Sequence, residues 1–300
     1  MRVLVVVNPK ASRAADVLPV LPGWFSDRAD SVFVATGSQD ELRQTLKEHG
    51  PQADRIVIGG GDGTISGALP QLLDLGKPLA VLPLGTANDF ANTLGLPADA
   101  LSACEVALEG RPHKIDVGLV NGHPFLNVAS VGVAANVAHA QTTALKRRWR
   151  MLAYVISLVH AARKSNPFVV TLTVDDTPAW SGPVYQVSVG NGRFHGGGLT
   201  VADHAAIDDG KLDLYVVSPG PVWQLVACIT HLKFGFAAPE LLQRNCAVHV
   251  TLSTRTPRPI NADGELRTET PAELTVHRHG LTVIVPSTLP PGHRGLVELD

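Results

Sequence analysis

The sequence predicts an α/β domain with a parallel sheet, followed by a domain built mainly from antiparallel strands. In the first third of the chain, short apolar runs rich in β-branched residues alternate with helical patterns, which is typical of parallel strands covered on both faces. After about Arg111–Gly118, strand-like runs follow one another directly, with turn residues between several of them. We therefore place the domain boundary in that segment.

The first domain is expected to contain four buried strands joined by helices. The apolar runs are Val3–Val7, Val32–Ala35, Ile56–Ile58 and Leu79–Leu82. Helical patterns cover Ser38–His49 and Thr64–Leu75, and the Gly-Pro and Gly-Lys-Pro sequences that follow them are typical helix ends.

The second domain is expected to be rich in strands. The runs are Ile115–Val120, Phe125–Val133, Phe168–Val174, Val184–Val189, Leu212–Val217, Val248–Leu252, Leu274–Val276 and Leu281–Val285. Asn121-Gly122 and Asp208-Asp209-Gly210 are turn signals. Two helical insertions, at about Thr143–Lys164 and Val222–Leu242, interrupt the strands.

Composition excludes several classes of protein. The 300 residues are 45% hydrophobic and 17% charged, which excludes a disordered chain. There are 25 Lys and Arg against 27 Asp and Glu, so no global basic charge indicates a nucleic-acid partner. The three cysteines are far apart and form no CxxC pair, which argues against a disulfide framework or a thiolate zinc site.

The first residues read as a strand and not as a signal peptide. The longest apolar stretch, Met151–Ala162, is too short to span a bilayer. We therefore expect a soluble, cytoplasmic protein. A peripheral position at the inner membrane face and a homodimer are both left open.

The strongest local signal is the glycine-rich turn Gly59–Thr64, which follows the third strand. Glycines let the backbone approach a ligand closely, and the helix that begins there directs N–H groups at an anion. The turn therefore predicts phosphate binding, with Asp62 holding Mg²⁺ or capping the helix. The simpler alternative is an ordinary strand-to-helix turn of small residues.

A second polar loop, Pro83–Ala91, follows the fourth strand. Because the carboxyl ends of neighbouring parallel strands meet at one edge of the sheet, we expect Thr86, Asn88 and Asp89 to face the glycine turn. The alternative makes Thr86 a helix N-cap with Asp89 as its capping-box partner.

Together the two loops resemble the diacylglycerol kinase catalytic family of lipid kinases, within the superfamily that also holds NAD kinases. The Gly-Gly-Asp-Gly-Thr sequence is common to the superfamily, and Leu84-Gly85-Thr86-Ala87-Asn88-Asp89 points to the lipid-kinase branch. Six further matches follow in the family's order: Asn8-Pro9, Thr36, Lys114–Gly118, Asn191–Gly198, Asp208–Asp213 and Ala262–Glu265.

The resemblance implies an NAD kinase/diacylglycerol kinase-like fold, with residues 1–115 binding ATP and residues 116–287 forming a β-sandwich. Residues 288–300 would return to the first domain, and the active site would lie between the domains. The ATP contacts that it implies are Asn8, Thr36, Gly60, Gly61, Gly63, Thr64 and Thr86.

The same resemblance assigns the acidic residues. Asp62 would organise catalytic Mg²⁺, supported by Asp89 and Asp116 behind it, and Glu265 would be the general base on the acceptor hydroxyl. A structural Mg²⁺ would bind the side chain of Asp209 and the carbonyl groups of Ala206 and Lys211. The alternative for Asp209 is a plain Asp-Gly turn.

Two departures from the family pattern stand out. The family usually continues x-Asn-Glu after the glycine turn, whereas this chain has Ile65-Ser66-Gly67. That replaces a polar pair close to the nucleotide. The opening loop Lys10–Ala14 lacks the usual glycine, and its basic residues either contact phosphates or are simply solvated.

The resemblance implies transfer of phosphate from ATP to a lipid hydroxyl, with diacylglycerol as the model acceptor. An NAD kinase, a kinase of soluble alcohols and a catalytically silent nucleotide-binding regulator are the alternatives.

Two apolar segments have two interpretations each. The basic residues Lys146–Arg150 and the apolar helix after them fit either a helix on a membrane surface or a helix in the protein core. Val222–Phe236 fits either the lining of an acyl-chain cleft or part of the core. For His277-Arg278-His279 we favour an exposed strand face over a metal site.

Overall fold

The structure, a computed structural model, divides the chain into two units. Unit 1 comprises Met1–Val117, Ala206–Asp209 and His277–Asp300, and unit 2 comprises Gly118–Ala205 and Gly210–Val276. The residues described are 1–132, 166–192, 205–221, 223–224, 227–228, 231, 242–290, 293 and 295–296.

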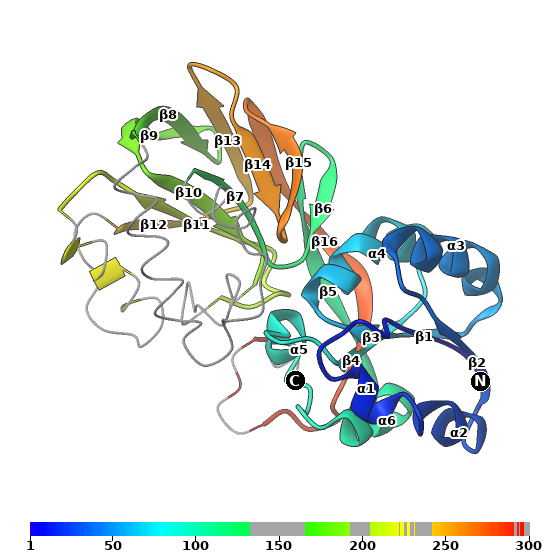
Figure 1. Cartoon of the computed structure of the whole chain (residues 1–300). Helices are drawn as coiled ribbons and strands as arrows, with labels where there is room; N and C mark the ends of the chain where they lie inside the picture. Colours follow the sequence, from blue (N-terminus) through cyan, green and yellow to red (C-terminus); the bar gives the residue numbers. More distant parts are fainter. Residues whose placement is uncertain are drawn as a thin grey trace. The chain divides into compact units, whose positions relative to one another are not determined.

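Parallel strands form the centre of unit 1, in the order β2-β1-β3-β4-β16 (Figure 1). These strands are β1 (Arg2–Val7), β2 (Asp30–Ala35), β3 (Arg55–Gly60), β4 (Leu79–Pro83) and β16 (Ala272–Val285). Val5 is paired with Phe33 on one side and Val57 on the other, and Val283 of β16 is paired with Leu79. The four strands expected from the apolar runs are confirmed.

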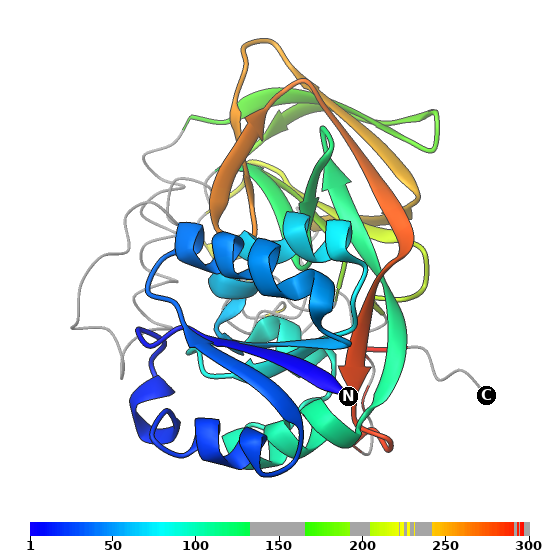
Figure 2. The same ribbon diagram turned by 90° about the vertical axis from the view of Figure 1, so that its right-hand side faces the viewer.

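Helices cover both faces of this sheet. Figure 2 shows α3 (Gln39–His49) and α4 (Asp62–Leu75) side by side on one face. The other face carries α1 (Ala14–Val17), α2 (Leu21–Ser26) and α6 (Ala100–Glu109), whose apolar residues pack against β1, β3 and β4. The short elements η1 (Gly50–Gln52) and α5 (Asp89–Thr93) lie in the connections.

Local signals explain where the helices begin and end. The Ser38 hydroxyl accepts a hydrogen bond from the Glu41 N–H at the start of α3, and Asp99 caps α6 in the same way. Helix α4 ends at Gly76, whose φ of 60° is in the left-handed region that glycine tolerates.

Unit 2 is a sandwich of antiparallel strands around one apolar core. One sheet has the order β12-β11-β10-β7-β14-β15, and the other contains β13, β8 and β9 beside the first half of β16. The bounds are β7 (Val128–Gly132), β8 (Phe168–Val174), β9 (Thr177–Val184), β10 (Gln186–Gly190), β11 (Leu212–Val217), β12 (Leu242–Ala247), β13 (His249–Thr254), β14 (Pro259–Ala262) and β15 (Glu265–Glu269). Strands β5 (Arg111–Val120) and β6 (His123–Phe125) form a hairpin around Asn121-Gly122, as expected.

Three details differ from the sequence-based expectation. The expected strand Phe125–Val133 is divided: Phe125 ends β6 and β7 begins at Val128, while the N–H groups of Leu126 and Asn127 between them bind Asp263. Leu274–Val276 and Leu281–Val285 belong to the single strand β16. Four polar or proline-containing strands, β9, β12, β14 and β15, were not expected because they lack a continuous apolar run.

Several expectations fall outside the described residues. They concern the insertion at Thr143–Lys164 with its basic start, most of Val222–Leu242, and the glycines at 196–198. Within the part of the chain that the structure describes, no helix is long and apolar enough to cross a membrane.

Candidate active site

The loops after β1, β3 and β4 are joined by backbone hydrogen bonds at the carboxyl edge of the unit 1 sheet. The Asn8 N–H donates to the Gly59 carbonyl (2.8 Å), and the N–H groups of Leu84 and Gly85 donate to the Gly60 carbonyl (3.0 and 3.1 Å). The glycine turn Gly59–Thr64 therefore lies between the loop after β1 and the loop Pro83–Ala91 after β4. Its position matches the edge at which parallel α/β sheets bind ligands.

Two glycines allow the loops to approach this closely. A Cβ added to Gly85 would lie 2.4 Å from the Gly61 Cα, and one added to Gly61 would lie 3.1 Å from the Gly85 Cα. The first distance is far below van der Waals contact, so residue 85 must be glycine for the two backbones to keep this arrangement.

Asp62 joins the glycine turn to the second loop. It is the first residue of α4, and its Oδ1 accepts a hydrogen bond (2.9 Å) from the N–H of Phe90, near the start of α5. The expected alternative in which Thr86 caps that helix is wrong. Helix α5 begins at Asp89, and its N-cap position is Asn88, which makes no capping side-chain bond. Asp62 thus satisfies an N–H of the neighbouring helix and does not cap its own.

The other expected nucleotide contacts surround the same edge. The Asn8 side chain donates to the Thr64 hydroxyl (3.2 Å), and the Thr86 hydroxyl donates to the Ser12 hydroxyl (3.3 Å). Thr36 is buried, and its N–H donates to the Val7 carbonyl at the end of β1. Gly63 accepts a hydrogen bond from Gln39. The side chains of Asn8 and Gln39 therefore contact the glycine turn directly, at Thr64 and Gly63.

The basic residues of the opening loop are exposed and make hydrogen bonds to neighbouring loops. The Lys10 Nζ donates to the Gly37 carbonyl (2.7 Å), and the Arg13 Nη1 donates to the Ala98 carbonyl (2.7 Å). Both side chains therefore tie neighbouring loops together while remaining at the surface.

Asp89 and Asp116 are both buried, at 2% and 1% exposure. Asp89 is the first residue of α5, where a carboxylate is favoured by the helix dipole. The Asp116 Oδ1 accepts a hydrogen bond (2.7 Å) from the N–H of His279, which has a φ of 52°. This left-handed residue lies within β16, and the side chains of His277, Arg278 and His279 are all exposed.

The expected metal-binding turn is attached to β5. The Asp116 N–H donates to the Ile207 carbonyl (2.7 Å), and the buried side chains of His113 and Asp208 form a pair 2.7 Å apart. Ala206 is buried, Asp209 is half-buried and Lys211 is exposed. In the described part of the chain no three His, Cys, Asp or Glu side chains are grouped to hold a metal, so carbonyl oxygens would have to complete a site at this turn.

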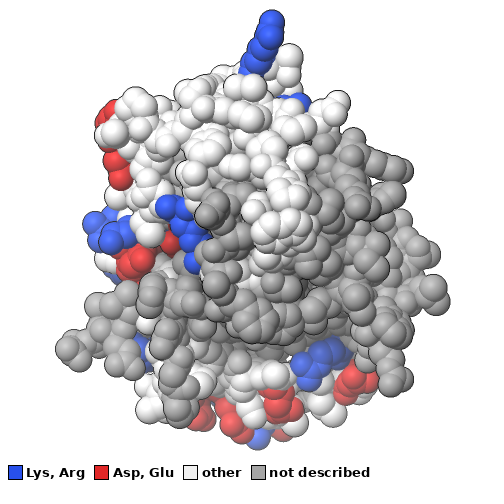
Figure 3. Space-filling view, turned by 90° about the vertical axis from the view of Figure 1, so that its left-hand side faces the viewer, with Lys and Arg blue, Asp and Glu red and all other residues white. Residues whose placement is uncertain are grey.

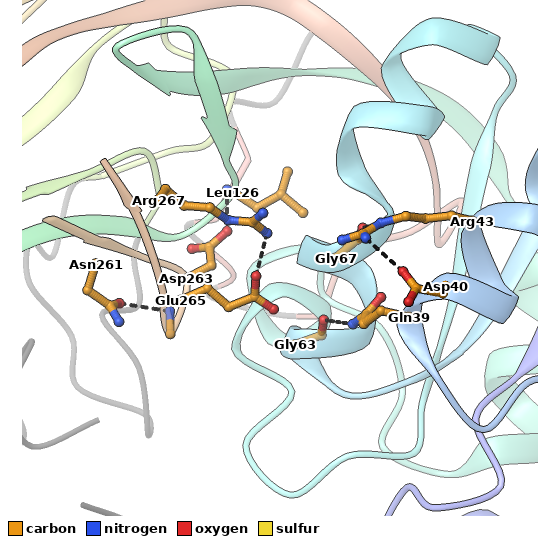
Figure 4. Close-up of polar contacts among 11 residues, drawn as sticks. Gln39, Asp40, Arg43, Gly63, Gly67, Leu126, Asn261, Asp263, Glu265 and Arg267 are labelled. Atoms are coloured by element: carbon orange, nitrogen blue, oxygen red, sulfur yellow. Dashed lines mark hydrogen bonds and ion pairs between the residues drawn. The ribbon is translucent and has the colours of Figure 1, made fainter. Parts of the chain in front are cut away.

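In unit 2, Asp263 anchors the turn that carries Glu265. Its carboxylate accepts hydrogen bonds from the N–H groups of Leu126, Asn127 and Val128, at 2.7, 2.9 and 3.0 Å. Figure 4 shows the first of these, from Leu126. Asp263 and Gly264 have φ values of 49° and 94°, and the Gly264 N–H donates to the Asn261 side chain. This turn delivers the chain into β15, whose first residue is Glu265.

Glu265 forms an ion pair with Arg267, with 2.8 Å between Oε2 and Nη2. The Glu265 side chain is 43% exposed and the Arg267 side chain is 21% exposed. The Glu265 carboxylate is therefore accessible at the surface and is oriented by its cationic partner.

Reasoning from the sequence missed four residues that support these sites: Ser12, Gln39, His113 and Asp263. Each acts through a partner distant in the sequence, so no local pattern marks Ser12, Gln39 or His113. Asp263 carried the clearest signal, because an Asp-Gly pair often adopts a turn in which the Asp side chain binds nearby backbone.

Charge on the described surface is mixed in sign. On the face shown in Figure 3, Lys and Arg side chains lie close to Asp and Glu side chains. Described residues on that face therefore form no patch of a single sign.

Comparison with known proteins identifies the class. The sequence profile of the diacylglycerol kinase catalytic domain matches residues 2–120, and that of the YegS C-terminal NAD kinase beta sandwich-like domain matches residues 127–285. The two profiles divide the chain between a kinase catalytic domain and a β-sandwich. The protein is therefore a kinase.

Relatives with curated names agree. A protein of Chromohalobacter salexigens named "Probable lipid kinase YegS-like" is 36% identical over 219 residues, covering 70% of this chain and 69% of its own. A protein of the same name from Stenotrophomonas maltophilia is 33% identical over 276 residues, covering 87% and 88%. The chain belongs to the family of YegS-like lipid kinases.

Solved structures share the fold. A diacylglycerol kinase from Bacillus anthracis superposes with a TM-score of 0.75 at 23% identity, covering 96% of this chain and 98% of that one. An NAD kinase from Archaeoglobus fulgidus, in complex with ATP, gives a TM-score of 0.54 at 13% identity, covering 98% and 96%. The expected NAD kinase/diacylglycerol kinase-like fold is confirmed.

Proposed function

We propose that this chain transfers the γ-phosphoryl group of ATP to the hydroxyl of a diacylglycerol-like lipid, with Mg²⁺ as cofactor. The proposal depends on one observation above all. Backbone N–H groups of the loops after β1 and β4 donate hydrogen bonds to the carbonyl groups of Gly59 and Gly60, so these two loops and the glycine turn are joined. A preformed loop edge at a helix N-terminus is suited to hold a polyphosphate. Asn8, Thr36, Gly60, Gly61, Gly63, Thr64 and Thr86 are the proposed ATP contacts.

The donor groups available fit Mg²⁺, which prefers hard oxygen ligands. Asp62 would hold the ion used in catalysis, with Asp89 and Asp116 fixing the surrounding structure, and Asp209 with the carbonyls of Ala206 and Lys211 would hold a structural ion. Bound Mg²⁺ would neutralise charge on the phosphates. The buried His113–Asp208 pair supports the second site, because it fixes the residue next to Asp209.

In the proposed reaction Glu265 accepts the proton of the acceptor hydroxyl as its oxygen attacks the γ-phosphorus. The bond from the γ-phosphorus to the bridging oxygen breaks, and ADP leaves with that oxygen. The N–H groups of the glycine turn and the hydroxyls of Thr64 and Thr86 stabilise the charge on the phosphates. The Arg267 ion pair keeps the carboxylate of Glu265 in a defined orientation.

The direct test is transfer from labelled ATP to a panel of diacylglycerol, other lipids, NAD⁺ and soluble alcohols, with the products identified by mass. We expect a phosphorylated lipid. Labelled NADP⁺ or a labelled soluble alcohol in its place would contradict the proposed acceptor. A chain that binds ATP but labels no acceptor would contradict the kinase assignment.

Glu265→Gln tests the base. We expect turnover to fall by about 10²–10⁴-fold, because the amide cannot accept the proton, while the melting temperature stays close to that of the parent protein. Glu269→Gln is the matched control, since Glu269 is an exposed acid on the same strand. Near-normal turnover in Glu265→Gln would remove Glu265 from the mechanism.

A further inference from the structure

Gln39 contacts the glycine turn from a neighbouring helix. It is the first residue of α3, and its Nε2 donates a hydrogen bond (2.7 Å) to the Gly63 carbonyl in the first turn of α4 (Figure 4). Because the partner is a carbonyl oxygen, the amide nitrogen must be the atom that faces Gly63. The orientation of the Gln39 amide is thus determined.

Gly67 provides the space that the Gln39 side chain occupies. A Cβ added to Gly67 would lie 2.2 Å from the Gln39 Cδ and Oε1 and 2.3 Å from its Nε2. Glycine is unfavourable inside a helix, and residue 67 lies in the middle of α4. A side chain at residue 67 and the present position of Gln39 therefore exclude each other.

The amide is held by packing as well as by its hydrogen bond. Its Oε1 is buried and has no hydrogen-bond partner among the described residues. A second bridge lies nearby, where the Arg43 Nε donates to the Gly67 carbonyl (3.4 Å) and the Arg43 Nη1 pairs with Asp40 (3.2 Å). A buried oxygen without a hydrogen-bond partner costs free energy, so another contact of the same side chain must offset that cost. That contact is the hydrogen bond from the Gln39 Nε2 to the Gly63 carbonyl in the glycine turn.

The positions involved are those at which the chain departs from the family pattern. Ser66 and Gly67 stand where that pattern has Asn and Glu. The loss of the side chain at residue 67 opens the space through which an amide from α3 reaches Gly63.

We propose that Gln39 is a positioning residue of the nucleotide site, which supplies from α3 the polar group missing at residue 67. It acts by fixing the Gly63 carbonyl, and with it the peptide planes whose N–H groups face the phosphates. The inference rests on the proposed function, because it requires the ATP phosphates to bind at residues 60–64.

The first test replaces the donor without changing shape. Gln39→Glu keeps the size of the side chain but places an acceptor opposite the Gly63 carbonyl. We expect the Kd of Mg-ATP, measured by calorimetry without acceptor, and the KM for ATP to rise about tenfold, the equivalent of one lost hydrogen bond, with a smaller change in kcat. Gln44→Ala is the control, because Gln44 is exposed on the same helix and should leave both constants unchanged.

The second test uses the mutual exclusion of residues 39 and 67. Gly67→Ala should weaken ATP binding as Gln39→Glu does, because it displaces the amide. In a Gln39→Ala background, Gly67→Ala should have no further effect. Gln39→Ala with Gly67→Gln, which presents an amide from α4 itself, should recover most of the affinity.

The outcomes separate the two proposals. If the parent protein binds no Mg-ATP, the proposed function fails and this inference fails with it. If the parent binds Mg-ATP and Gln39→Glu binds it equally well, the inference alone is wrong. Melting temperatures are measured for every variant, and changes in stability without any change in Kd or KM would reduce Gln39 to a packing residue and overturn the proposal.

Discussion

The loop edge of unit 1 and the Glu265 turn of unit 2 are held in place by different means. Around residues 60–64, several loops bind one another through backbone groups, and side chains such as those of Asn8 and Asp62 add to contacts that already exist. The turn before Glu265 is held mainly by side chains: the Asp263 carboxylate binds three consecutive N–H groups, and the Asn261 side chain binds the Gly264 N–H. The first region should therefore tolerate the loss of a side chain structurally, and the second should not.

Asp62→Asn should show the largest effect in unit 1, and it should be on chemistry. The amide keeps an oxygen for the Phe90 N–H but removes the charge that we assign to Mg²⁺, so turnover should fall by at least about 10–100-fold with little change in melting temperature. Asp62→Ala should lose turnover too, with a loss of only about 1 kcal/mol of stability, because a single N–H loses its acceptor. Asp74→Asn, at an exposed acid of α4, is the control. A large loss of stability in Asp62→Asn would contradict the contrast between the regions.

Asp263→Ala should produce the largest structural effect. It leaves three N–H groups without their acceptor and places alanine at a φ of 49°, so we expect the free energy of unfolding to fall by about 3 kcal/mol. Urea denaturation measures it. Asn8→Ala in unit 1 is the comparison, with an expected loss of about 1 kcal/mol. Equal losses would show that both regions depend on single side chains to the same degree.

Mg²⁺ should stabilise the protein through the Asp209 turn. An ion bound only by the folded state adds about 2.7 kcal/mol at a concentration of 100 times its Kd, so chelation should lower the melting temperature by several degrees. Asp209→Asn should remove most of that dependence, and Asp208 should not be altered in the same variant because it pairs with His113. If neither Mg²⁺ nor a chelator changes the melting temperature, Asp209 binds no structural ion and is a plain turn residue.

The smallest expected effect concerns the reactivity of the three cysteine thiols, two of which are buried and one exposed. Burial raises the pKa of the Cys104 thiol and of the Cys228 thiol to about 12, whereas Cys246 is exposed. At neutral pH a thiol reagent should label Cys246 alone in the folded protein and all three in denaturant. Since unfolded thiols ionise near about 8.5, the folded state should lose stability as the pH rises above that value. Rapid labelling of Cys104 at neutral pH would show that unit 1 opens more readily than its packing indicates.

The sequence predicted the buried strands and the two loops well, because apolar runs and glycine turns are local patterns. Val3–Val7 and Phe168–Val174 are examples of runs that became strands. It did not predict β9, which contains prolines, or β15, which contains charged residues, because neither has an apolar run. Both are strands because they pair with neighbouring strands. The hydrogen bonds Asp62–Phe90 and Gln39–Gly63 join residues 28 and 24 positions apart. They could not be predicted from local patterns, because they depend on the order of the strands in the sheet. The role of Glu265 came from resemblance alone.

Strand β16 limits how the chain can be divided. It lies beside β4, so the sheet of unit 1 is completed by residues near position 283. A fragment that stops at residue 120, where the catalytic-domain profile ends, would expose the apolar edge of β4 and invite pairing between fragments. During synthesis this edge of β4 stays unpaired until the residues near position 283, about 200 positions further along the chain, have left the ribosome.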